Sequence, residues 1–331
     1  MHQSPIFLIG NHKSGTSLLR SLLDSHEDLF VIPNEIHPFK HLGYWIDYDM
    51  RKNYPKQLSV REKVRNFKEW IEYSNQAFDK YADSDTRNIW DLDLLNNLVK
   101  QRLETDQEIS DKDLVDFFLE TPYQLIQKKP IPQNKRIVEK SVEHGEFAAD
   151  LQKMYPHAKF VHIIRNPYSN LVSIRKYIGR NKFPFLRDPV NALYNSYYYL
   201  EKNQRIIDNY FVIRYEDLLT KPDETISEIA EFLGIPNQNS LYQPSSLGGN
   251  WAGNSTNNVE FKGISAKNIN SWKTNITDIE IKLVNKLFSQ ILSKYNYEKL
   301  EPSESFWKRD KAEDNLKSYI GNRLFPRFYL K

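Results

Sequence analysis

Length, composition and charge limit the classes of protein to which this chain can belong. It has 331 residues, of which 40% are apolar and 27% are charged, a balance typical of a folded globular protein and not of a disordered chain. At roughly 150 residues per domain, the length fits one large α/β domain or two ordinary ones. The 46 Lys and Arg residues exceed the 43 Asp and Glu residues by +3, too little for a protein that mainly coats nucleic acid or an anionic membrane. Cysteine is absent, which excludes disulfides, zinc-thiolate sites, iron–sulfur clusters and cysteine nucleophiles.

The sequence contains no pattern typical of a membrane or secretory segment. No stretch approaches the ~18 uninterrupted apolar residues of a membrane helix. The start, Met1–Pro5, carries no basic leader and no cleavage site before the short apolar run at 6–9. We therefore expect no transmembrane segment and a cytoplasmic location.

Four short apolar runs predict strands of one parallel sheet. They are Ile6–Ile9, Ile137–Val138, Ala158–Ile164 and Tyr210–Tyr215. The first run is followed by a polar turn and then by leucines at 18, 19, 22 and 23, whose spacing marks one face of a helix. Similar helical patterns follow the third and fourth runs. Repeated strand, turn and helix predict an α/β fold with a P-loop-type parallel sheet flanked by helices.

The segments between and after these runs predict a helical insertion, a loop and a tail. In residues 41–130, which are dense in Tyr, Trp, Lys, Asp and Asn, one amphipathic helix is expected from Val60 to Tyr81 and another after Ser110. We interpret this block as an insertion that covers the site on the acceptor side. Residues 236–268 are rich in Asn, Ser and Gly, which predicts a long loop. We expect a single domain over 1–300 and a basic, aromatic extension over 301–331.

The turn after the first strand is the first candidate anion site. Gly10–Ser17 joins a strand to a helix, so its backbone N–H groups and the positive end of the helix face one concave spot. The spacing of its glycines is similar to the nucleotide-triphosphatase loop G-x-x-x-x-G-K-[ST]. However, Thr16 follows Gly15, and the lysine stands earlier, at Lys13. Taken alone, a structural connection without a ligand remains the alternative.

A second candidate anion site follows the third predicted strand. Arg165 ends that strand, and Ser173 lies eight residues later in the next helix. A guanidinium and a hydroxyl at this spacing are suited to clamp a phosphate. Two phosphate sites on adjacent strands fit a ligand that is phosphorylated at both ends of a ribose.

These motifs resemble those of sulfotransferases that use 3′-phosphoadenosine-5′-phosphosulfate (PAPS). The similarity extends over about residues 5 to 300 and is greater to the carbohydrate and tyrosyl-protein branches than to the branch that acts on small phenols. Besides the two phosphate motifs, it covers Asn34-Glu35-Ile36-His37, Glu139-Lys140-Ser141, Tyr155–Phe160, Arg214-Tyr215-Glu216-Asp217-Leu218, Phe232-Leu233-Gly234, Ser255 and Ser271-Trp272-Lys273. Lys13 stands where many relatives have Arg, which preserves the positive charge.

The resemblance implies a role for each candidate residue. The residues that bind the 5′-phosphosulfate end are His12, Lys13, Ser14, Gly15, Thr16 and Ser17, and those that bind the 3′-phosphate are Arg165 and Ser173. Glu35 is the expected general base, with His37 as rival or auxiliary base. Lys13 stabilises the leaving phosphate, and Lys140 lies near the transferred sulfonate. Tyr215 borders the adenosine, and Ser255 is a possible second donor to the sulfonate.

PAPS is therefore the expected co-substrate, and no metal is expected because sulfuryl transfer needs none. The acceptor hydroxyl is expected on a glycan or glycoconjugate, with a peptide tyrosine or a small alcohol still open and no nucleic acid as partner. Two alternatives stand beside this interpretation. One is a P-loop kinase or nucleotide hydrolase, and the other is a catalytically silent scaffold protein that binds PAP, the desulfonated donor.

Overall fold

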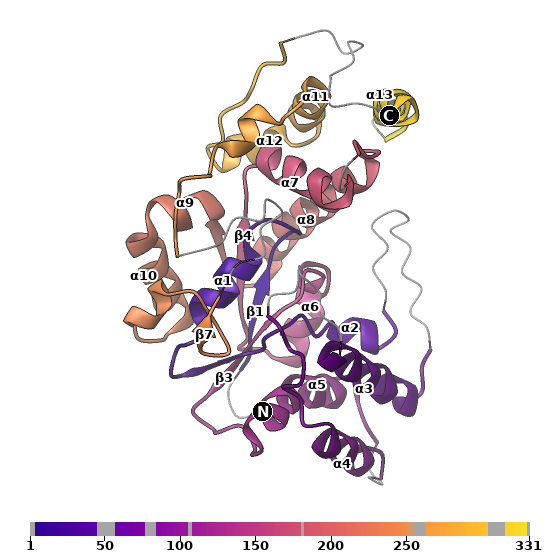
Figure 1. Ribbon diagram of the computed structural model, residues 1–331, viewed down its shortest axis with the longest axis vertical. Coiled ribbons are helices and arrows are strands. Elements are labelled where there is room, and N and C mark those ends of the chain that lie inside the picture. The colour runs from indigo at the N-terminus through magenta and orange to yellow at the C-terminus, as the bar shows by residue number, and fades with distance from the viewer. Residues whose placement is uncertain are drawn as a thin grey trace.

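The fold is built around one parallel sheet. The computed structural model describes residues 4–44, 57–76, 84–104, 108–179, 182–251, 253, 263–303 and 315–329. Five strands lie in the order β2-β3-β1-β4-β5, and every neighbouring pair is parallel. They are β1 (Ile6–Ile9), β2 (Leu29–Val31), β3 (Arg136–Lys140), β4 (Lys159–Ile164) and β5 (Tyr210–Arg214). Helices surround this sheet (Figure 1), which confirms the expected α/β class.

The described helices divide between the two faces of the sheet and the insertion. Those before β3 are α1 (Thr16–Leu23), α2 (Pro38–His41), α3 (Val60–Gln76), α4 (Leu92–Leu103) and α5 (Asp111–Gln127). Those after it are α6 (His144–Met154), α7 (Pro167–Gly179), α8 (Arg187–Ile206), α9 (Tyr215–Thr220), α10 (Pro222–Leu233), α11 (Asp278–Leu287), α12 (Ser289–Lys294) and α13 (Leu316–Tyr329). Within the described ranges, no helix combines the length and the hydrophobicity that a membrane crossing requires.

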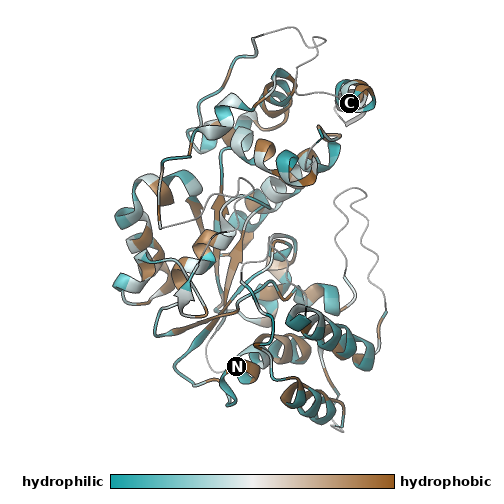
Figure 2. Cartoon of the chain, in the orientation of Figure 1, coloured by the Kyte–Doolittle hydropathy of each residue, from teal (hydrophilic) through white to brown (hydrophobic). Residues whose placement is uncertain are grey.

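Both faces of the sheet are covered, which explains why its strands are uninterrupted apolar runs. In β1 the side chains alternate: Phe7 and Ile9 belong to the core shared with α5 and α6, whereas Ile6 and Leu8 belong to the core shared with α1 and α10. All four are fully or almost fully buried. Figure 2 shows the apolar strands at the centre and the hydrophilic residues on the outer helices.

The strand order fixes where a ligand would bind. β1 lies between β3 and β4, so the chain leaves the two sides of β1 by different crossovers. In open α/β sheets, ligands bind outside the carboxyl ends of the strands at such a switch point. The segments that reach this edge follow β1, β3 and β4 and begin at Gly10, Ser141 and Arg165.

Most expected elements are present, with differences in detail. Ser110 caps α5 in a capping box with Asp113, as its sequence predicts. α3 ends at Gln76, and the expected continuation to Tyr81 lies outside the described residues. The strand β2 was not expected, because three residues are too few to show a periodic pattern. In the 236–268 segment, the described part contains a short antiparallel pair, β6 (Ser245–Ser246) and β7 (Gly249–Asn250).

The C-terminal extension forms α13, which packs against the rest of the chain. The buried Phe325 ring lies 5.4 Å from the ring of Phe185, in an edge-to-face arrangement. On another side of the same helix, Leu316, Ile320 and Leu324 are exposed. The aromatic residues of the tail therefore serve, at Phe325, to attach it.

A close approach at the phosphate loop yields the first prediction. Gly15 has φ +109°, and a Cβ there would lie 2.4 Å from Cδ2 of Tyr215. Gly15→Ala should therefore lower the free energy of unfolding by about 2–4 kcal/mol, from left-handed strain and overpacking together. Urea denaturation measures this. The control is Gly248→Ala, where φ is +74° and a Cβ meets nothing within 4 Å; equal losses in both variants would contradict the close packing of Tyr215 on the loop.

Candidate functional site

The loop after β1 forms the first part of the site. Gly15 is the N-cap of α1, and Lys13 has φ +61°, so the loop turns tightly into the helix. The first amide groups of a helix have no partner within it and point out of its N-terminus. The hydroxyl of Ser14 is buried and has no hydrogen-bond partner among the described residues. This combination of amides, hydroxyl and helix end is suited to hold a phosphate.

Two asparagines fix the shape of this loop. The side-chain amide of Asn170, on α7, donates to the carbonyl of His12 at 2.8 Å. The side-chain oxygen of Asn11 accepts from the amide of His12 at 2.9 Å, and the amide of Ser14 donates to the carbonyl of Asn11 at 3.1 Å. The sequence analysis did not identify Asn170, although it stands between Arg165 and Ser173.

Arg165 lies directly against this loop. Its Nη1 donates to the carbonyl of Lys13 at 2.9 Å. Its guanidinium carbon lies 4.7 Å from the centre of the Tyr215 ring, which also packs on Gly15. The Nε of Arg165 is buried without a hydrogen-bond partner among the described residues. The two predicted phosphate sites are therefore neighbours at one edge of the sheet.

The segment 214–218 positions Arg165. Glu216 accepts from the amide of Asn166 at 3.0 Å and, through its other oxygen, from the hydroxyl of Tyr297 at 3.0 Å. Since Asn166 follows Arg165, Glu216 fixes the turn between β4 and α7. Tyr215 stacks on the guanidinium from the same segment.

The helix α7 faces the loop with two further groups. Ser173 is half-buried on this helix, two turns beyond Arg165. The Lys13 ammonium lies 4.7 Å from the centre of the Tyr177 ring, so the lysine side chain extends toward α7. Tyr177 was not singled out by the sequence analysis, because an aromatic residue in a helix carries no specific signal.

A group of charged residues follows β2 and β3. Lys140 donates to Oε1 of Glu35, and Nε2 of His37 lies 3.6 Å from Oε2 of the same carboxylate. The other ring nitrogen of His37 hydrogen bonds to Glu143 at 2.9 Å. The hydroxyl of Ser141 accepts from the amide of His37 at 3.1 Å. The structure thus brings Glu35, His37 and Lys140 together, as expected, and adds Glu143.

Glu139 anchors this group to the sheet. It is fully buried, and its Oε1 accepts from the amide of Ile36 at 3.0 Å and from the hydroxyl of Ser141 at 2.6 Å. Its Oε2 hydrogen bonds to the imidazole of His144. The similarity at Glu139-Lys140-Ser141 therefore has a structural basis, because Glu139 ties the loop that carries Glu35 to β3.

The charges of the group are unequally placed along the pH scale. For Glu35, burial favours the neutral acid, but the positive charges of Lys140 and His37 outweigh it and lower its pKa to about 2. For His37, burial favours the neutral ring, but the carboxylates of Glu143 and Glu35 raise its pKa to about 9. At neutral pH, His37 is thus an imidazolium between two carboxylates.

His12 is the neutral imidazole of the site. Burial is the main cause that lowers its pKa, and Glu35, Lys140, Glu143 and Lys13 all act on it electrostatically. His12 therefore lies close enough to sense both the Glu35 group and the phosphate loop. This position connects the two halves of the site, which the sequence placed only on the loop.

The geometry also contains one set of side chains that could ligate a metal. Oxygen and nitrogen atoms of Glu35, His37 and Glu143 lie within 4.8 Å of one another. Lys140 and the protonated His37 already balance the two carboxylates. The arrangement therefore satisfies itself as an ion-pair network, and we assign it no metal role. Ser255, the remaining predicted site residue, lies outside the described residues.

The comparison with protein families decides what this site belongs to. The family described as "Sulfotransferase family" matches residues 5–239, which includes both phosphate sites and the Glu35 group. The chain belongs to the sulfotransferase family. The branch within the family is not determined by this match.

Known proteins agree with this assignment. The omega-hydroxy-beta-dihydromenaquinone-9 sulfotransferases Stf3 of Mycobacterium bovis and Mycobacterium tuberculosis are 22% identical over 258 residues, 70% of this chain and 63% of their own length. The sulfotransferase domain from the curacin biosynthetic pathway superimposes with a TM-score of 0.55 at 20% identity, over 89% of this chain and 98% of that domain. The domain from the Synechococcus PCC 7002 olefin synthase gives 0.51 at 17% identity, over 86% and 94%. These two structures show a shared fold.

The raised pKa of His37 gives a prediction for this sulfotransferase. Glu143→Gln removes the carboxylate that contacts the imidazole, so the pKa of His37 should fall from about 9 by about 1 to 2 pH units. Titration of the ring by NMR measures it, with the exposed Glu228→Gln as a control that leaves the value unchanged.

The same shift predicts a pH dependence of stability. Because folding raises the pKa of His37 from 6.5, its ion pairs stabilise the fold fully below pH 6.5 and are lost as pH rises through about 9. The stability difference between wild type and Glu143→Gln should therefore narrow over this window. A His37 that titrates near 6.5 in the wild type would contradict the ion-pair network.

Proposed function

We propose that this sulfotransferase binds PAPS across the carboxyl ends of β1 and β4 and transfers its sulfuryl group to an alcohol hydroxyl. The observation that supports this most is the contact between Arg165 and the carbonyl of Lys13, because it places two phosphate-binding groups side by side. The loop amides, Ser14, Thr16 and Ser17 would hold the 5′-phosphate. Arg165 and Ser173 would hold the 3′-phosphate.

The chemistry requires stabilisation of the leaving phosphate and a base for the acceptor. By analogy with phosphoryl transfer, the transition state is loose, with negative charge growing on the leaving oxygen. We assign Lys13 to that oxygen, after its side chain turns from Tyr177 toward the donor. Lys140, at the end of β3, is assigned to the sulfonate.

The pairing of Lys140 with Glu35 has a consequence for the base. With Lys140 bound to it, Glu35 has a pKa of about 2 and accepts a proton weakly. When the sulfonate attracts Lys140, the carboxylate loses its main positive neighbour, and its pKa rises. In this proposal, donor binding itself turns Glu35 into an effective base.

Glu35 is preferred to the imidazoles of the site. His37 is protonated at neutral pH and has no lone pair available, so it is suited to orient Glu35 and not to accept a proton. His12 is neutral and close to Glu35, so it is the second choice for the base. His37 thus has the role of an auxiliary group in our proposal.

For the acceptor, we propose an alcohol hydroxyl on a glycan or glycoconjugate. The Tyr, Trp, Lys and Asn content of the insertion led to this preference, but part of that aromatic content belongs to the core, since Phe67, Trp90 and Phe118 are buried. Tyr73 on α3 is 67% exposed and available to stack on a sugar. A lipid alcohol is the second candidate, because the relatives named above are sulfotransferases of an omega-hydroxy menaquinone.

A kinase or nucleotide hydrolase is less consistent with the loop. Thr16 occupies the position where such enzymes carry the lysine that contacts the β- and γ-phosphates. Magnesium-dependent hydrolysis of ATP or GTP would support that alternative. A silent PAP-binding scaffold would bind the donor and transfer nothing to a panel of glycans, lipid alcohols and peptides with labelled sulfate.

The donor assignment predicts a ligand-specific effect of Arg165→Ala. Loss of a hydrogen bond to a charged group costs about 1.5–3 kcal/mol, so PAP affinity should fall by about 10- to 150-fold. AMP, which lacks the 3′-phosphate, should bind the wild type and the variant alike. Calorimetry with both ligands measures this, with the exposed Arg205→Ala as control. An equal loss for AMP and PAP would mean that Arg165 acts only through the loop.

The base assignment predicts the effect of Glu35→Gln. The variant keeps the shape of the side chain but removes its basicity, so turnover should fall by about 10²- to 10⁴-fold. PAP affinity should stay within about twofold, since Glu35 contacts no phosphate in this proposal. The comparison variant His12→Gln should lower turnover less. Persisting activity in Glu35→Gln together with its loss in His12→Gln would transfer the role of base to His12.

A further inference from the structure

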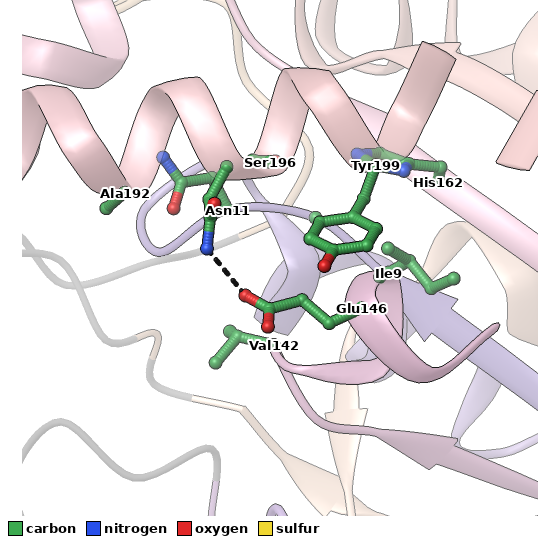
Figure 3. A pocket seen from close by; sticks show the side chains of 11 residues that line it. Ile9, Asn11, Val142, Glu146, His162, Ala192, Ser196 and Tyr199 are labelled. Atoms are coloured by element: carbon green, nitrogen blue, oxygen red, sulfur yellow. Dashed lines mark hydrogen bonds between the residues drawn. The ribbon is translucent and has the colours of Figure 1, made fainter. Parts of the chain in front are cut away.

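A cavity lies on the face of the sheet opposite α1, beside the start of the phosphate loop. It encloses about 300 Å³, at the low end of the range for small-molecule pockets, so it fits a small group and not a whole nucleotide. Its lining residues are Ile9, Gly10, Asn11, Val142, Gly145, Glu146, His162, Ala192, Asn195, Ser196 and Tyr199. Figure 3 shows α6 and α8 contributing opposite walls, with the end of β1 between them. The mechanism above assigns no function to it.

His162 is a buried polar group that lines this cavity. The residue is 1% exposed, and its Nε2 has no hydrogen-bond partner among the described residues. Its Nδ1 hydrogen bonds to the hydroxyl of Tyr210 at 2.6 Å. Burial lowers the pKa of His162 to about 3, so the ring is neutral, and Nε2 is a donor or an acceptor according to the tautomer. A hydroxyl group, which both donates and accepts, matches either tautomer.

The remaining polar groups favour the same kind of ligand. The side-chain amide of Asn195 donates to Glu146 at 2.7 Å, which is the bond drawn in Figure 3. Glu146 is the acidic residue of the lining, and the lining contains no Lys or Arg. A phosphate or sulfate would therefore be repelled, whereas hydroxyl groups find an acceptor at Glu146 and a partner at Ser196.

The cavity is also close to the reacting groups. Gly10 and Asn11 lead into the phosphate loop. Val142 stands between Ser141 and Glu143, whose side chains contact His37. A ligand in the cavity would therefore lie between the phosphate loop and the segment that holds the Glu35 group.

We propose that this cavity binds a second hydroxyl-bearing part of the acceptor, so that the enzyme prefers polyhydroxylated acceptors to alcohols with a single hydroxyl. The inference rests on the proposed function and narrows its acceptor class. The apolar wall formed by Ile9, Val142 and Ala192 would contact the carbon skeleton, and Glu146, His162 and Ser196 would contact its hydroxyls.

The experiment compares hexyl β-glucoside with 1-hexanol, which share an alkyl chain and differ in the sugar. Binding is measured by calorimetry on enzyme saturated with PAP. The wild type should bind the glucoside at least about tenfold more tightly. Ala192→Leu, which fills the cavity, should remove this preference and leave 1-hexanol and PAP affinity within about twofold. Glu146→Gln, which keeps the volume, should weaken glucoside binding several-fold, and the exposed Glu228→Gln is its control.

The outcomes separate this proposal from the proposed function. Unchanged glucoside affinity in both cavity variants, or equal binding of the two ligands to the wild type, would overturn the cavity assignment while PAP binding still supports the donor site. Loss of PAP binding in the wild type would overturn the donor site. Glucoside binding that Ala192→Leu abolishes would even then support the cavity.

Discussion

The site depends on one contact, between the guanidinium of Arg165 and the carbonyl of Lys13. It joins the segments that follow β4 and β1, and Tyr215 secures it by stacking on Arg165 and packing on Gly15. Glu216 fixes the turn that carries Arg165, so a segment far along the chain determines the spacing of the two anion sites. A parallel sheet provides the frame, because its strands end at one edge and β1 lies at the switch point.

A second constraint is the balance of charge around Glu35. Two carboxylates, Glu35 and Glu143, lie beside Lys140 and the protonated His37, so each negative group has a positive neighbour. Such a network is stable without a donor but holds Glu35 as a weak base. A donor with several negative charges competes for the same cations, which couples donor binding to the reactivity of the acceptor side.

The sequence predicted the positions of the site better than its contacts. Strand ends were predictable because apolar runs stop where polar residues begin, as at Arg165. Glu35, His37 and Lys140 came from a family resemblance, and the structure groups them. The partners Glu143, Asn170 and the cavity residue His162 were missed, because one charged or amide side chain in a helix or strand carries no signal until the tertiary fold shows what it faces. The short β2 lacked a period for the same kind of reason.

The central claim is that one nucleotide is held by both strand ends. A crystal structure of the complex with PAP tests it most directly. The account predicts the 5′-phosphate against the amides of residues 13–17 and the 3′-phosphate within hydrogen-bonding distance of Arg165 and Ser173. A PAP molecule whose 3′-phosphate contacts neither of these two side chains would contradict it.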